Sequence, residues 1–119
     1  NRIRKRDFDM IGGNIDGELQ VKTTVKNEIG EGVSTWKTVN VLRGWLDLQN
    51  GDSKYGNYNA KIQESTHVFI CDYVELDPEV KKENNRMVVD GYVYDVMLID
   101  NPMNLNQQLE IYLKYTGGQ

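Results

Sequence analysis

Two residues with nucleophilic and acid–base chemistry, His67 and Cys71, stand four positions apart in the run THVFICDYV. A cysteine nucleophile needs a base within hydrogen-bonding distance. The run has the composition of a β-strand, in which residues four apart face the same side but lie about 13 Å apart, at roughly 3.3 Å per residue. The two side chains therefore cannot pair directly. We expect Cys71 to be a small buried residue and His67 a strand residue beside a loop.

The remaining chemical groups do not assemble a catalytic set. Asp47 with Asp52, and Asp95 with Asp100, are imaginable carboxylate pairs, but acidic residues at strand ends are common and nothing singles out either pair. One cysteine and one histidine cannot complete a tetrahedral zinc site, and no Asp/Asn loop ends in the Glu of a calcium-binding loop. The glycine-containing runs lack the strand–loop–helix context of a phosphate-binding loop. We therefore expect neither enzymatic activity nor a cofactor.

Two tyrosines raise the alternative of nucleic-acid binding. Tyr92 and Tyr94 lie on one face of an expected strand, where they would be placed to stack on bases, as in single-strand-binding barrels. Such a platform usually has basic neighbours, whereas Asp90 and Asp95 flank these tyrosines. Packing in a core or an interface is therefore the favoured role for both rings.

The composition indicates one globular domain of 119 residues with a modest core, since 39% of the residues are hydrophobic and 27% are charged. No run reaches the roughly 20 apolar residues of a membrane-spanning helix, and the basic start NRIRKR is not followed by the apolar stretch of a signal peptide. The single cysteine allows no internal disulfide, which favours a reducing compartment.

The net charge of −4 is unevenly distributed. Residues 1–10 carry four basic against two acidic residues, and the remainder carries 10 basic against 16 acidic residues. An acidic body should bind a polyanion poorly, because nucleic-acid affinity depends on basic groups that displace counterions. We expect a partly ordered basic arm over residues 1–17, whose candidate partner-docking residues are Arg2, Arg4, Lys5 and Arg6. A solvated terminus without a partner is the simpler interpretation of the same charges.

The rest of the chain reads as short strands joined by polar turns. Alternation of apolar and polar residues predicts strands from residue 18 and over 107–115, and Val, Thr and Trp enrich residues 33–48, which we expect to split or bend sharply near Asn40. Residues 66–74 form another expected strand. Asp77-Pro78 predicts a single helical turn, and Asp90-Gly91 predicts a tight hairpin between two apolar runs. The prediction is an all-β fold, a small antiparallel β-barrel of six or seven strands spanning residues 18–116, with a flexible tail at 117–119.

One segment, residues 49–66, fits neither period and holds almost no aliphatic mass. Long loops of this kind in compact domains are usually functional or disordered. We interpret it as a polar loop inserted in the barrel and serving assembly or a channel. Its candidate residues are Asp52, Ser53, Lys54, Tyr55, Asn57, Tyr58, Asn59 and Lys61.

The order of these runs resembles that of the head closure proteins of tailed bacteriophages, also called head–tail joining or stopper proteins. The similarity extends over residues 21–113 and is most specific around Trp36, at Thr66-His67, and in the DGYVY hairpin followed by an Asp-Asn-Pro turn. Members often carry a basic residue where this chain has Cys71 and Asp72, so that residue's contacts are not carried over.

The resemblance implies a small barrel that assembles with itself as a ring, typically of twelve subunits, beneath the portal and adaptor of the capsid. Such a ring closes the DNA channel after packaging and later forms part of the path to the tail, so its partners would be the portal–adaptor complex, a tail terminator or tail-completion protein, and double-stranded DNA in transit. The implied location is the neck of the virion, after assembly in the host bacterial cytoplasm and without a membrane. Two alternatives remain open: a tail-completion or other neck protein, and a nucleic-acid-binding β-barrel module.

Overall fold

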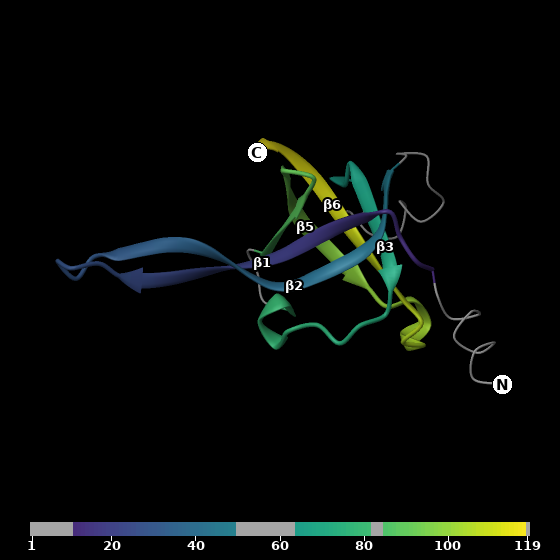
Figure 1. The fold of residues 1–119 in the computed structure, drawn as a ribbon, viewed down its shortest axis with the longest axis horizontal. Coiled ribbons are helices and arrows are strands. Elements are labelled where there is room, and N and C mark those ends of the chain that lie inside the picture. The colour runs from purple at the N-terminus through teal and green to yellow at the C-terminus, as the bar shows by residue number, and fades with distance from the viewer. Residues whose placement is uncertain (1–10, 50–63, 82–84, 119) are drawn as a thin grey trace.

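The computed structural model describes residues 11–49, 64–81 and 85–118, without the side chains of residues 81 and 118. Six strands account for most of these residues, and two short 3₁₀ turns lie between them (Figure 1). The elements in chain order are β1 (Ile15–Lys26), β2 (Gly32–Leu48), β3 (His67–Asp72), η1 (Pro78–Lys81), β4 (Asn85–Val89), β5 (Tyr92–Asp100), η2 (Pro102–Asn104) and β6 (Gln108–Gly118).

The strands form one antiparallel sheet that closes on itself in the order β1-β2-β3-β6-β5-β4, with β4 returning to β1. The predicted all-β class, the antiparallel pairing and the strand number are confirmed. Because the sheet is closed, every strand has two neighbours within the barrel, and the sheet has no free edge there.

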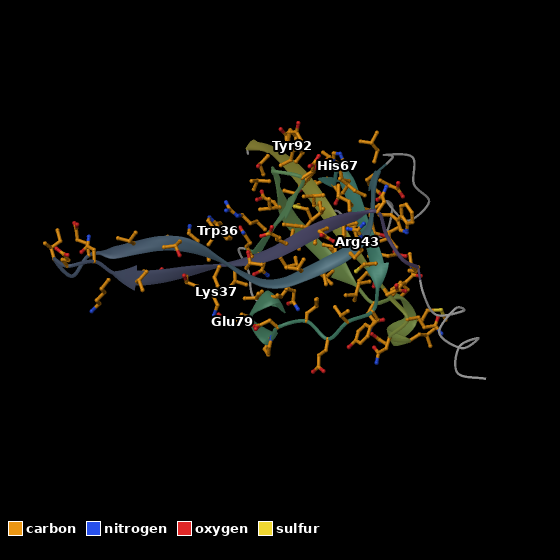
Figure 2. All side chains as sticks on the ribbon, in the orientation of Figure 1. Trp36, Lys37, Arg43, His67, Glu79 and Tyr92 are labelled. Carbon is orange, nitrogen blue, oxygen red and sulfur yellow. The ribbon has the colours of Figure 1, made fainter. Side chains whose placement is uncertain are left out.

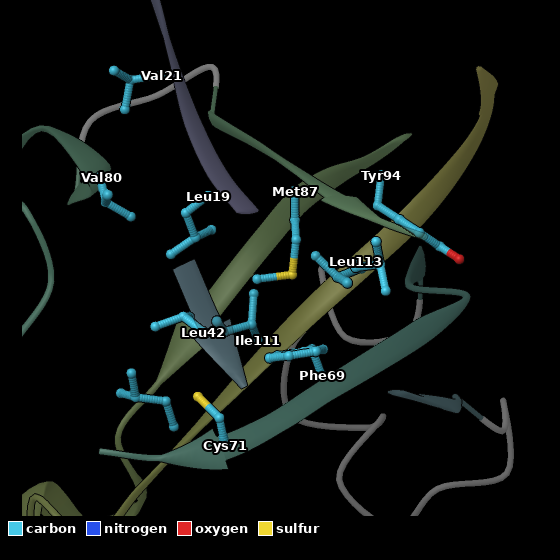
Figure 3. Packing of buried hydrophobic residues seen from close by; sticks show 12 residues of the cluster. Leu19, Val21, Leu42, Phe69, Cys71, Val80, Met87, Tyr94, Ile111 and Leu113 are labelled. Atoms are coloured by element: carbon cyan, nitrogen blue, oxygen red, sulfur yellow. The ribbon is translucent and has the colours of Figure 1, made fainter. Parts of the chain in front are cut away.

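Alternation along the strands places the core. Leu109, Ile111 and Leu113 of β6 are 3%, 0% and 0% exposed, as their period of two requires. Their side chains meet those of the other strands inside the barrel (Figure 3). The remaining members of this buried cluster are Leu19, Val21, Leu42, Phe69, Cys71, Val80, Met87, Val89 and Tyr94.

A second, smaller cluster was not predicted. Val68 of β3 and Tyr112 of β6 are 9% and 7% exposed, and Ile70, Met97 and Leu98 pack against them. Tyr112 alternates with the inward Ile111 and Leu113, so this cluster lies on the outer wall of the barrel. The phenol of Tyr112 donates a hydrogen bond to Oε1 of Glu110 at 3.0 Å. In the alternation of β6, Tyr112 shares the outward side with Glu110 and Lys114.

Two turn predictions are confirmed by backbone geometry. Asp90 and Gly91 have φ angles of +52° and +81°, as a tight hairpin turn with both central residues in the left-handed region requires. Pro78 begins η1, and Oδ1 of Asp77 accepts a hydrogen bond from the backbone N–H of Glu79 at 2.9 Å. The chain therefore turns where the sequence indicated.

The long second strand differs from expectation. β2 is continuous, and its pairing with β1 shifts where Leu19 lies opposite Asn40 but Gln20 lies opposite Thr38. Val39 is thus an extra residue in β2, a β-bulge beside the predicted bend. β1 begins at Ile15, inside the expected arm, and β6 continues through Gly118, where the sequence had predicted a tail.

Candidate assembly surface

The most prominent feature outside the barrel is a two-stranded hairpin. β1 pairs with β4 only from Gly17 to Val21, and β2 pairs with β3 only from Gly44 to Leu48. Beyond Val21 the two long strands pair only with each other in the described chain, and Figure 1 shows them leaving the barrel together. We call residues 22–37 the projecting hairpin. Sequence periodicity predicted its two strands but not that they leave the core as a separate ribbon.

The two faces of the projecting hairpin differ in chemistry. Residues directly opposite each other in antiparallel strands share a face. One face carries the Val25–Val33 pair, whose side chains are 57% and 43% exposed, next to the Thr23–Thr35 pair. The opposite face carries Lys22 across from Trp36, and farther out Lys26. An apolar strip of exposed valines therefore lies on one side and Lys22 and Lys26 on the other, whereas Lys37, across from Val21, shares the valine side at the root.

The tip of the hairpin is held by its own hydrogen bonds. Oδ1 of Asn27 accepts bonds from the backbone N–H groups of Ile29, at 3.1 Å, and Glu31, at 2.9 Å. Gly30 takes a φ of +85°, a conformation that glycine adopts without steric cost. This turn leaves Ile29 78% exposed at the tip of the hairpin.

The root of the hairpin is attached to the barrel through a cation–π contact. The guanidinium carbon of Arg86, from β4, lies 4.3 Å from the centroid of the Trp36 ring. Nε of the same arginine donates a hydrogen bond to Oε1 of Gln20 at 2.7 Å. One β4 side chain therefore binds both β1 and β2 where they leave the barrel.

A group of aromatic rings lies where β3 begins, β5 begins and β6 nears its end. Tyr94 packs against His67 and Tyr115 with centroid distances of 5.1 and 5.5 Å, and Tyr92 packs against Tyr115 at 6.0 Å. Tyr94 is 5% exposed and Tyr92 is 42% exposed. The packing role expected for these tyrosines is found for Tyr94, and burial raises the pKa of its phenol, with smaller contributions from Tyr115, Tyr92 and Asp90.

The two ends of the polar loop predicted at 49–66 meet beside these rings. The backbone N–H of Gln49 donates to the carbonyl of Thr66 at 2.8 Å, and that of Thr66 donates to the carbonyl of Leu113 at 2.8 Å. Oγ1 of Thr66 accepts a further bond from the N–H of Tyr115 at 2.8 Å. The loop thus emerges from a well-bonded junction of β2, β3 and β6.

The candidate residues predicted within that loop, 52–61, lie outside the described residues, as do Arg2, Arg4, Lys5 and Arg6. The structure does show where the arm leaves the barrel. The carboxylate of Asp72 accepts bonds from the N–H groups of Ile11, at 2.5 Å, and Gly12, at 3.1 Å. The indole N–H of Trp45 donates to the carbonyl of Ile11 at 3.1 Å. Asp72, one of the two positions that depart from the resembled family, therefore holds the backbone at residues 11 and 12 against the barrel.

The candidate chemical groups stay apart, as their spacing predicted. Cys71 is 1% exposed, and burial, assisted by the charge of Asp72, raises the pKa of its thiol to about 11. Nδ1 of His67 lies 2.8 Å from Oγ1 of Thr66 rather than near a nucleophilic sulfur, and burial lowers its pKa. At neutral pH the thiol is protonated and weakly nucleophilic.

Neither a metal-ligand cluster nor a membrane-spanning helix is found in the part of the chain that the structure describes. No group of three or more His, Cys, Asp or Glu residues there is arranged to hold a metal ion. No helix there is long and apolar enough to cross a membrane.

Asp95, one of the carboxylates considered as a pair with Asp100, lies between basic residues. It is across from Arg86 on one side and Lys114 on the other, which makes it part of an alternating charge row on the outer wall.

Comparisons with known proteins show that this chain resembles solved structures in its fold. No protein-family model matches the chain, and no curated protein matches it by sequence. The solution structure of protein SF1141 from Shigella flexneri 2a matches with a TM-score of 0.64 and 16% identity, over 92% of this chain and 97% of that one. A chain in the virion of a native gene transfer agent particle matches with a TM-score of 0.51 and 10% identity, over 84% of this chain and 91% of that one. The chain therefore shares its fold with a protein of a virion particle.

Proposed function

We propose that this protein is a non-enzymatic structural subunit of a phage-like virion. The observation that carries the proposal is the fold shared with a chain of the gene transfer agent virion, which covers 84% of this chain. The order of strands and turns, from the Trp36 region to the DGYVY hairpin, supports the same class. A barrel with a projecting hairpin that exposes Val25, Ile29 and Val33 is also a suitable shape for a subunit that works only in contact with neighbours.

Within the virion, we propose a ring that closes the DNA channel below the portal and adaptor and joins head to tail. In this role the loop bearing Tyr55 and Tyr58 is directed to the channel or interlocks neighbouring subunits. Outside the projecting hairpin, the described residues carry four basic against twelve acidic residues. A passage with that charge does not retain the double-stranded DNA that must slide through it.

The test is complementation of the phage that encodes this chain. Deletion of the gene is expected to leave capsids that package DNA, then lose it or fail to acquire tails. Electron microscopy of such particles, with labelled protein added back, would locate the chain at the neck. Normal tailed particles in the absence of the gene would contradict the proposal.

The identity of the binding partner distinguishes the proposed head closure role from the alternative role of a tail-completion protein. A head closure subunit binds the purified portal–adaptor complex, whereas a tail-completion protein binds tails, and sedimentation with each partner distinguishes the two. Replacement of Arg2, Arg4, Lys5 and Arg6 by alanine is expected to leave folding intact and to weaken docking on an acidic partner at low salt. An unchanged affinity would exclude the arm from docking.

A further inference from the structure

We infer that two copies of this chain pair through the free edge of β2 in the projecting hairpin, antiparallel and related by a twofold axis that passes beside Ser34. The two hairpins then form one four-stranded sheet, in which the tip of each hairpin lies beside the root of the other. The inference concerns free chains in solution and does not rest on the proposed virion role. It is built entirely from described residues.

The outer edge of β2 in the hairpin has no neighbour among the described strands. β3 pairs with β2 only from Gly44 to Leu48, so residues 32–37 are paired with β1 alone. An edge strand offers unpaired backbone groups to any further strand, and proteins usually protect such edges with charged side chains. Residues 32–36 contain no charged side chain. A two-stranded ribbon is also at best marginally stable in water, and additional strands stabilise it.

The hydrogen bonds at the tip show which backbone groups of this edge point outward. The N–H of Asn27 donates to the carbonyl of Glu31 at 2.9 Å, so these two residues form a hydrogen-bonded pair of the ladder. Hydrogen-bonded and non-hydrogen-bonded pairs alternate along an antiparallel ladder. Counted from the tip along the β1–β2 register, Gly32, Ser34 and Trp36 belong to non-hydrogen-bonded pairs. Their N–H and C=O groups therefore point away from β1, toward a strand added at this edge.

Opposite charges lie at the two ends of the same edge. Glu31 lies at the tip, and Lys37 lies at the root, where β2 leaves the barrel (Figure 2). Both share the side of the ribbon that carries Val33, because residues two apart in a strand face the same way. Neither side chain forms an ion pair with a described residue, the one such pair being Arg43 with Asp16. An antiparallel copy of β2 therefore brings an acid to each base and a base to each acid.

One register satisfies both the backbone groups and the charges. With Ser34 opposite Ser34 of the second copy, Glu31 of each copy lies across from Lys37 of the other. Opposite residues in antiparallel strands share a face, so both ion pairs form on the valine side. Val33, which is 43% exposed, then lies across from Thr35 of the second copy and diagonal to Val33 of that copy. The two exposed apolar strips become one.

The other edge pairings lack this complementarity. Two β1 edges in the equivalent register, centred on Thr24, place Lys22 across from Lys26 of the second copy, and like charges directly opposite each other are destabilising. For an edge formed by β1 of one copy and β2 of the other, Lys22 and Lys26 lie on the face opposite Glu31. No antiparallel register can therefore place these lysines across from Glu31. The edge of β2 is thus best matched to a second copy of itself.

The resulting contact is isologous and self-limiting. Both copies use the same surface, so the pairing closes at two chains and does not propagate. It therefore differs from the contact that repeats around a ring, and a hairpin paired in this way cannot offer the same edge to a ring neighbour. The paired segment is short, residues 32–36 of each chain, which places the interface at the small end of specific contacts. We expect a weak dimer that forms at high protein concentration.

Disulfide cross-linking of full-length chains tests the register. The twofold axis brings the Cα atoms of the two Ser34 residues to about 5.5 Å, a separation that a disulfide spans. Under mild oxidation, Ser34→Cys is expected to form covalent dimers about tenfold faster than Thr24→Cys, its exposed cross-strand neighbour on the same face. The parent chain, whose Cys71 is 1% exposed, gives the background. Equal rates for the two variants, or faster cross-linking between Ser34→Cys and Thr24→Cys chains in a mixture, would overturn the twofold arrangement.

Charge reversal tests the two ion pairs. Glu31→Lys and Lys37→Glu are each expected to weaken dimerisation by about tenfold at low salt, since each places like charges at both ends of the interface. The chain with both substitutions is expected to dimerise like the parent, because the reversed residues face each other between copies. Within one chain the two positions lie about 20 Å apart, at roughly 3.3 Å per residue, so this rescue cannot arise inside a single hairpin.

Sedimentation over a concentration series measures dimerisation of each variant, and circular dichroism verifies that each barrel is folded. Single variants that dimerise like the parent, or a double variant no better than the single ones, would overturn the proposed register.

Discussion

At the scale of single residues, the tightest position in the wall is Gly44. It lies opposite Ile15 of β1 and Cys71 of β3, where three strands meet. A Cβ atom there would lie 2.3 Å from the carbonyl oxygen of Ile70 and 2.9 Å from Cβ of Cys71. The glycine therefore permits close approach of β3, while the bulge in β2 lies at Val39.

We predict that Gly44→Ala destabilises the barrel by about 2 kcal/mol or more, because backbone rather than a flexible side chain must move. Chemical denaturation measures the loss. Gly30→Ala is the control for glycine substitution outside the wall, since nothing lies within 4 Å of its Cβ position, although its positive φ carries a cost of its own. A Gly44 variant as stable as the parent would contradict the close packing described here.

His67 makes the barrel sensitive to acid. Burial lowers the pKa of its imidazole below the ordinary value of 6.5, so the folded state takes up a proton less readily than the unfolded chain. Its contribution to stability is therefore complete above about pH 6.5 and decreases as the pH falls through and below that value. Thermal unfolding between pH 7 and 5 should show a larger decrease for the parent than for His67→Gln. Identical pH profiles would exclude His67 as the source.

At the scale of elements, the orientation of the projecting hairpin depends on the contacts of Arg86 at its root. Arg86 contacts Trp36 and Gln20 at the root, whereas the Arg43–Asp16 pair is exposed and joins β1 to β2 within the barrel. Cation–π contacts are worth roughly 0.5–2 kcal/mol, and exposed ion pairs about 0–1 kcal/mol. The two arginines therefore form a natural comparison.

We predict that Arg86→Ala accelerates amide hydrogen exchange in residues 22–36 and leaves exchange in the β3–β6 core unchanged. Arg43→Ala should alter neither. Exchange that rises equally throughout the barrel in the Arg86 variant would show that the arginine supports the core rather than the hairpin orientation.

The polar loop is expected to contribute to assembly and little to stability. Residues 52–61 contain no aliphatic side chain larger than alanine, and loop closure changes by only about 0.6 kcal/mol per doubling of length. Replacement by a short Gly/Ser linker should lower the melting temperature by a few degrees, a cost on the order of 1 kcal/mol or less. Phage production should nevertheless collapse, with Tyr55 and Tyr58 as the main contributors. A wild-type titre would refute the assembly role, and an unfolded variant would show that these tyrosines pack on the barrel.

At the scale of the whole molecule, charge and shape together suit a subunit that assembles without holding DNA. The net charge is −4, and the basic residues concentrate in the arm and the projecting hairpin. We predict that the isolated chain is monomeric or weakly associating, because association costs translational and rotational freedom and the ordering of side chains. We also predict that it binds duplex DNA negligibly at physiological salt, because an acidic body displaces few counterions. Analytical ultracentrifugation and fluorescence anisotropy test the two statements. A stable ring at micromolar concentration without partners, or salt-dependent DNA binding of micromolar affinity, would contradict them.

The sequence by itself determined the class of fold and the local turns. The alternation in β6, the Asp90-Gly91 turn and the Asp77-Pro78 cap are local signals whose physics involves neighbouring residues, so the pattern alone was enough. The distance between His67 and Cys71 followed from strand geometry in the same way. The candidate loop and arm residues came from composition and resemblance, and they remain predictions.

Only the tertiary structure decided which parts of the strands have neighbours. Val21 and Val25 have the same residue type and parity in one strand, yet Val21 is 4% and Val25 57% exposed, because β4 begins opposite Val21 and does not extend to Val25. Tyr112 faces the outer wall and is nevertheless 7% exposed for the converse reason: Val68, together with Met97 and Leu98 of β5, packs against it. Periodicity reports which side of a strand a residue faces. Whether anything lies on that side depends on where distant strands end, and local sequence does not contain that information.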